Sequence, residues 1–117
     1  MSSRPETALL VSAALRHANS QQVQMVLVRR GAATAGSVLV RLDLADGRCR
    51  LEGRVLDLEG KYRWRNLLNE DSLPADEVEA RLEREYRYDP DCWVIAIDSP
   101  DGVNTLAMLE EELMEGV

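Results

Sequence analysis

Four short segments with strand-like patterning follow one another between residues 23 and 66, separated by strong turn signals. The segments are rich in β-branched residues or alternate between apolar and polar side chains, a period typical of half-buried strands. Asp46-Gly47 predicts a tight hairpin because both residues tolerate a positive φ, and residues 57–60 supply another turn. The sequence therefore predicts an antiparallel meander of strands covering residues 23–28, 37–44, 48–56 and 61–66.

Helical patterns flank this predicted meander on both sides. Apolar residues recur at helical spacing over residues 6–19, although the short apolar run 9–13 is also compatible with a buried strand. Pro74 is well placed to begin a second helix, which Asp89-Pro90 would end. After that helix we expect an apolar strand over residues 92–98, a short edge strand over 103–106, and an acidic C-terminal helix or frayed tail over 107–117.

The order of these elements predicts an α+β fold in one domain, residues 1–117, with an antiparallel β-meander of four to five strands and two or three helices on one face. A chain of 117 residues can bury one modest core without disulfides or metals. The apolar run 8–15 is too short to cross a bilayer, which takes about 20 residues, and it lacks the layout of a secretion signal. We therefore expect a cytoplasmic protein that is not inserted in a membrane.

Charged residues are unevenly distributed along the chain. Residues 1–66 carry 11 Lys and Arg against 6 Asp and Glu, a net charge of +5, whereas residues 67–117 carry 3 against 15, a net charge of −12. The two halves add to the total of −7, which excludes a nucleic-acid binder built on overall positive charge.

Basic side chains alternate along two neighbouring strands of the predicted meander. If those strands pair across residues 57–60, one face of the sheet carries Arg48, Arg50, Arg54, Lys61, Arg63 and Arg65. Arginine suits planar anions such as phosphate, but the acidic second half of the chain can neutralise this face by intramolecular pairing. Tyr62 and Trp64 point away from the basic residues of their own strand, which favours a place in the core over stacking on bases. The balance argues against nucleic acid as a partner.

No catalytic or metal-binding constellation stands out. A zinc site would need four ligands, and the chain offers one histidine, His17, and two distant cysteines. Cys49 and Cys92 lie in strand-like segments, which predicts buried thiols. The loop at residues 31–36 has the glycine spacing of a phosphate loop, but it lacks the lysine and leads into a strand. We therefore predict no catalytic residue, metal or cofactor.

Three stretches of the sequence are similar to a known family. They are residues 11–16 (VSAALR), residues 28–31 (VRRG) continuing to 35–40 (AGSVLV), and Arg84-Glu85 with residues 89–94 (DPDCWV). Over residues 9–102 the chain resembles the alphaproteobacterial family called domain of unknown function 1491. The resemblance implies a small cytoplasmic bacterial domain and carries no activity, cofactor or substrate with it.

These observations predict a non-catalytic binding or protein-interaction module. Its expected surface combines the arginines of the sheet with the loop Arg29-Arg30-Gly31 and the turn Asp89-Pro90-Asp91. One alternative is a protein that binds phosphate or nucleic acid through the arginine-rich face. Another is a small enzyme that uses Asp89 or Asp91 with Arg29 or Arg30. The partner is left open, and the sequence is compatible with a monomer and with a homodimer.

Overall fold

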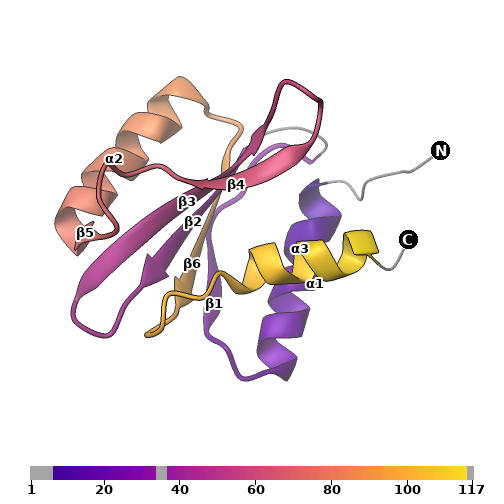
Figure 1. Ribbon diagram of the computed structural model, residues 1–117, viewed down its shortest axis with the longest axis horizontal. Coiled ribbons are helices and arrows are strands. Elements are labelled where there is room, and N and C mark those ends of the chain that lie inside the picture. The colour runs from indigo at the N-terminus through magenta and orange to yellow at the C-terminus, as the bar shows by residue number, and fades with distance from the viewer. Residues whose placement is uncertain (1–6, 34–36, 116–117) are drawn as a thin grey trace.

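The computed structural model describes residues 7–33 and 37–115 and shows an α+β fold with a six-stranded sheet (Figure 1). The predicted fold class is confirmed, and most strand pairs are antiparallel. In chain order the elements are α1 (Thr7–Ser20), β1 (Met25–Arg29), β2 (Val38–Asp43), β3 (Arg48–Leu56), β4 (Tyr62–Asn66), β5 (Leu73–Pro74), α2 (Ala75–Tyr88), β6 (Trp93–Asp98) and α3 (Thr105–Glu115).

The predicted meander holds only for β2, β3 and β4. The strand order is β1-β6-β2-β3-β4, with β5 paired to β3, so β6 is inserted between β1 and β2. It runs antiparallel to β1 and parallel to β2. The physical reason is that β6 is buried from Trp93 to Ile97, and an apolar strand of this kind needs neighbours on both edges and cover on both faces.

The helices cover both faces of the sheet, which corrects the expectation that they share one. Helices α1 and α3 lie together on the first face, where Leu10, Val11 and Leu106 pack on alternate residues of β2 and β6. Helix α2 covers part of the second face through Val78 and Leu82 (Figure 1). Because the central strands are apolar on both sides, a single layer of helices would leave half of their surface in water.

The two ends of the described chain are helical. Helix α1 excludes the alternative strand at residues 9–13; Glu6, where the helix was expected to begin, lies outside the described residues. The predicted edge strand at 103–106 is wrong because the Asn104 side chain accepts a hydrogen bond from the backbone N–H of Ala107 at 3.0 Å, an N-cap that starts α3 at Thr105. Among the described residues, every helix is too short or too polar to cross a membrane.

Candidate functional site

The pairing of β3 with β4 divides the predicted basic face between the two sides of the sheet. Arg54 lies opposite Trp64, and Leu56 lies opposite Tyr62. Arg48, Arg50 and Arg54 therefore share a face with Tyr62 and Trp64, and Arg63 and Arg65 lie on the other face. Residues 57–61 separate the two strands, and one residue more or less in that turn would exchange the two faces of β4. The expectation of one shared basic face is wrong.

Arg54 is bound by the acidic C-terminal helix. Its side chain is 4% exposed, and its Nε and Nη2 atoms both donate to Oε2 of Glu110 at 2.5 Å. The guanidinium also lies 3.7 Å from the centroid of the Tyr62 ring, and Trp64 Nε1 donates to Oε1 of Glu110 at 2.9 Å. At this point the acidic second half of the chain neutralises the basic half.

The other arginines of β3 also bind within the molecule. Arg48 donates through Nε and Nη2 to the side chain and the backbone oxygen of Ser72, both at 2.8 Å. Arg50 lies 3.4 Å from Glu52, whose second carboxylate oxygen accepts a hydrogen bond from Asn104 at 2.9 Å. These contacts tie β3 to the loop before β5 and to the start of α3.

On the opposite face of β4 the arginines are more accessible. Arg63 is exposed, and its Nε donates to Asp57 in the β3–β4 turn at 2.6 Å. Arg65 is also exposed and lies opposite Gly53. The six predicted basic residues therefore do not form one surface that could follow a phosphate backbone.

The structure brings the predicted loop Arg29-Arg30-Gly31 against the predicted turn Asp89-Pro90-Asp91. Arg29 Nη2 donates to the backbone oxygen of Pro90 at 2.9 Å, and its guanidinium lies 3.0 Å from the centroid of the Tyr86 ring. The guanidinium of Arg30 lies 5.4 Å from the Trp93 ring. Two segments that are 61 positions apart in sequence thus form one corner of the molecule, at the end of β1.

Gly31 is the residue that allows this close approach. A Cβ atom at this position would lie 2.3 Å from the backbone oxygen of Asp91 and 2.6 Å from Cδ1 of Trp93. Beside it, the backbone N–H of Ala32 donates to Asp91 at 3.0 Å, and Trp93 Nε1 donates to the backbone oxygen of Ala32 at 2.7 Å. The predicted loop is described only as far as residue 33, and residues 34–36 lie outside the described part.

The two carboxylates of the turn have local structural partners. Asp89 ends α2, and its Oδ1 accepts a hydrogen bond from the backbone N–H of Asp91 at 3.2 Å. Two depressions formed by described residues lie elsewhere: one of about 470 Å³ beside the turn after β6, and one of about 380 Å³ between α2 and the loop after β4. At this corner, the turn Asp89-Pro90-Asp91 packs against the end of β1, and neither depression lies beside it.

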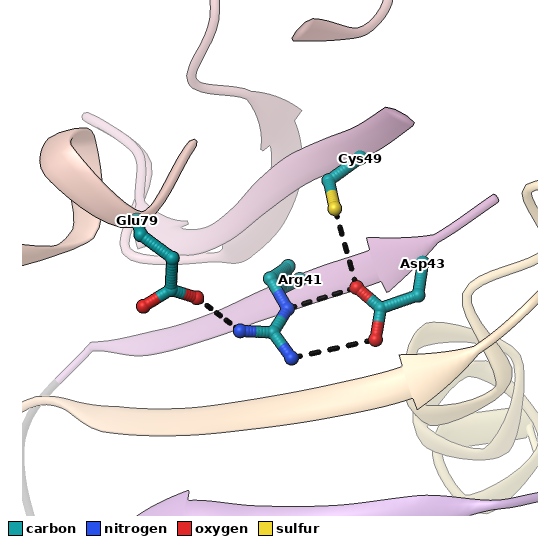
Figure 2. Close-up of polar contacts among 4 residues, drawn as sticks. All are labelled: Arg41, Asp43, Cys49 and Glu79. Carbon is teal, nitrogen blue, oxygen red and sulfur yellow. Dashed lines mark hydrogen bonds and ion pairs between the residues drawn. The ribbon is translucent and has the colours of Figure 1, made fainter. Parts of the chain in front are cut away.

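A polar cluster that the sequence did not reveal lies between β2, β3 and α2 (Figure 2). Arg41 donates from Nε and Nη2 to the two carboxylate oxygens of Asp43, at 2.9 and 3.3 Å, and from Nη1 to Glu79 of α2. Asp43 lies opposite Cys49 across the hairpin and accepts a hydrogen bond from its thiol at 3.3 Å. Arg41 and Asp43 are two residues apart on one strand, and this spacing was the available signal that they share a face.

Burial raises the pKa of Cys49 to about 11. The Asp43 carboxylate adds to the increase, because it accepts the hydrogen bond of the protonated thiol and its negative charge disfavours the thiolate. Burial and the charge of Asp89 likewise raise the pKa of Cys92 above its ordinary value. Both thiols are free and buried, as predicted. They stay protonated at neutral pH, and a protonated thiol is neither a good nucleophile nor a metal ligand.

Strand β1 carries two neighbouring accessible apolar side chains on one face of the sheet. This strand lies at one end of the strand order, so its outer backbone edge carries no strand in residues 7–33 and 37–115. Val26 and Val28 are 58% and 53% exposed, whereas Met25 and Leu27 point to the opposite face and pack against the core. Arg29 lies at one end of this strand, and the exposed Asp98 of β6 lies at the other. We call Val26, Val28, Arg29 and Asp98 the β1 surface.

Comparison with known proteins gives a consistent result. The family model described as "Protein of unknown function (DUF1491)" matches residues 6–107, which confirms the resemblance. No curated protein matches the chain.

Solved structures of similar proteins share the fold. A solution structure of protein Atu0922 from A. tumefaciens is 30% identical, with a TM-score of 0.72, covering 89% of this chain and 92% of that one. A crystal structure of a DUF1491 family protein from Caulobacter crescentus is 30% identical, with a TM-score of 0.73 and coverage of 86% and 92%. An NMR structure of a DUF1491 family protein from Caulobacter crescentus is 30% identical, with a TM-score of 0.76 and coverage of 89% and 94%.

Proposed function

The chain belongs to the DUF1491 family, and we propose that it is a non-catalytic protein-binding module whose contact surface is the free edge of β1. The observation that carries the proposal is the exposure of Val26 and Val28, 58% and 53%, on a strand whose outer edge is unpaired within the described chain. A free edge offers a row of backbone N–H and C=O groups to an extended segment of another protein.

The placement of the arginines supports a protein partner over phosphate or nucleic acid. Phosphate binding would need several basic side chains on one accessible surface. Arg54 is instead buried against Glu110, and Arg48 is bound to Ser72. Arg63 and Arg65 lie on the other side of the sheet.

The geometry of the turn supports a binding role over an enzymatic one. Catalysis by a carboxylate needs a group free to exchange a proton with a substrate held nearby. Asp89 accepts a hydrogen bond from its own turn, and the Arg29 guanidinium is held by Pro90 and Tyr86. Arg29 is the positively charged end of the β1 surface, Arg30 follows it in the chain, and Gly31 allows this end to pack against Asp91.

Site-specific photo-crosslinking in cells of the native host tests this function. A photoreactive amino acid at Val26 should give a covalent adduct with a protein chain, whatever its identity. The matched control is Leu56, which is also 58% exposed but lies on β3, away from β1. The proposal is wrong if position 26 yields no adduct or yields the same adducts as position 56.

A further inference from the structure

We propose that the β1 surface binds a second copy of this chain, through antiparallel pairing of the two β1 strands about a twofold axis. The inference rests on the proposed function, because it takes the β1 edge as the contact surface and names its occupant. Such a contact is isologous: each copy uses the same residues, and the two sheets join into one.

The side chains of β1 are complementary to themselves in this arrangement. With the axis at Leu27, the Val26 of each copy lies opposite the Val28 of the other, on the face where both are exposed. Directly opposed β-branched residues on one face of an antiparallel pair contact each other and stabilise the pairing. Residues 25–28 carry no charge, so the pairing desolvates no ionised side chain at its centre.

The charges at the two ends of the β1 surface determine the direction of pairing. The positive charges of Arg29 and Arg30 follow the last apolar residue of β1. The negative charge of Asp98 lies at the other end, where the backbone N–H of Asp98 donates to the backbone oxygen of Gln24 at 2.9 Å. Antiparallel pairing places the arginines of each copy beside the Asp98 end of the other. Parallel pairing would place like charges together, which is unfavourable.

The short length of β1 limits the strength of the dimer. The strand has five residues, and its pairing with β6 shifts register between Leu27 and Arg29, a bulge that shortens the regular edge. Stable interfaces bury about 1,200–2,000 Å² in total, and the area that one short strand pair buries lies at or below the low end of this range. The dimer should therefore dissociate on dilution.

Sedimentation of the purified full chain tests the association. Over about 10 μM to about 1 mM, a range that includes weak complexes, the mass should rise from the monomer's 13.1 kDa toward twice that value. Val28→Lys should weaken association by about tenfold or more, because each lysine would face an apolar side chain of the other copy. Leu56→Lys makes the same change in charge at an equally exposed apolar position and should leave association unchanged.

A cysteine at the predicted axis tests the register. Leu27→Cys should form a disulfide-linked dimer under mild oxidation, because residues opposed across an antiparallel pair lie within disulfide range. Leu56→Cys is the control and should stay unlinked. The native thiols of Cys49 and Cys92 are buried and should not compete in the folded protein. A thermal melt of each variant confirms that it is folded.

The outcomes separate this inference from the proposed function. A mass that stays monomeric at every concentration, or a dimer unaffected by Val28→Lys, overturns the second copy as occupant. If position 26 still crosslinks to a different protein in cells, the β1 edge remains a binding surface and only its occupant is wrong. If neither the purified chain nor the cell gives a contact at β1, both proposals fail.

Discussion

Strands β1 and β4 form opposite edges of one sheet, and they differ in their exposed side chains and in the contacts that hold them. The outward residues of β4 include the exposed Arg63 and Arg65, and charged side chains discourage pairing with another strand. The outward residues of β1 are Val26 and Val28, with no charge before Arg29. Proteins commonly protect both edges of a sheet, and the uncharged β1 edge is therefore the one that we propose a partner covers.

Different contacts hold the two edge strands to the rest of the protein. Strand β4 is held by a buried polar contact in which Glu110 of α3 binds both Arg54 and Trp64. The end of β1 is held by close backbone packing, with Gly31 against Asp91. Each anchor can be removed by one substitution, which allows the comparison to be tested.

The largest effect is expected at the β4 anchor. Glu110→Ala should lower the free energy of unfolding by about 3–5 kcal/mol, because it leaves the charge of Arg54 buried without its carboxylate. Urea unfolding measures this loss. Glu112→Ala, an exposed position on the same helix, should change stability by less than about 0.5 kcal/mol. Equal losses in the two variants would show that the ion pair does not anchor β4.

At the β1 anchor we expect a smaller and more local loss. Gly31→Ala should cost about 1–3 kcal/mol, because its Cβ atom overlaps Asp91 and Trp93. It should also speed hydrogen exchange of the Ala32 amide, which donates to Asp91.

The control for this local effect is Gly47→Ala. Gly47 has a φ of +79° and open space around it, so the substitution should cost about 1 kcal/mol but leave the Ala32 amide protected. Unchanged protection of Ala32 in Gly31→Ala would contradict the proposed packing.

The region between the two edges should respond to alkaline pH. The folded state raises the pKa of Cys49 from 9.0 to about 11, so it binds the thiol proton more tightly than the unfolded chain does. This contribution to stability is fully present below about pH 9 and is lost as the pH rises toward 11. The free energy of unfolding, measured with urea at several pH values in that window, should fall more steeply with pH for the wild type than for Cys49→Ala. Parallel curves would show that the thiol does not contribute.

Exposed positions on β1 should show the smallest effect on stability. Val26→Thr should change the free energy of unfolding by less than about 0.5 kcal/mol, because Val26 is more than half exposed. Val40→Thr, at a fully buried position of β2, should cost about 1–3 kcal/mol because it buries a hydroxyl. Measured at low protein concentration, similar costs at the two positions would mean that the β1 surface is already covered in the monomer.

Local signals in the sequence were sufficient for most individual elements. The strand predicted from Arg48 to Leu56 has the same bounds as β3, and Asp46-Gly47 marks the turn before it. Pro74 marks the start of α2 to within one residue: it is predicted to begin the helix, and in the structure it ends β5 directly before Ala75. These features depend on residues within one or two turns of each other, so the sequence contains the information directly.

The register of β3 with β4 depended on details of one turn. The side chain of Asp57 accepts hydrogen bonds from the backbone N–H groups of Glu59 and Lys61, both at 2.9 Å, which closes a turn that spans 57–61. A turn one residue shorter would have placed Arg63 opposite Arg54. The candidate basic face failed for this reason, although each arginine had been placed correctly along its own strand.

The sequence by itself determined most of the helices and strands, the burial of the two cysteines, and the acidic and basic halves of the chain. Only the tertiary structure decided that β6 enters the sheet between β1 and β2, that α2 covers the second face, and that Glu110 neutralises Arg54. The first group follows from short-range periodicity and composition. The second follows from pairing between distant segments, where many arrangements satisfy the same pattern and only the burial of every apolar face selects one.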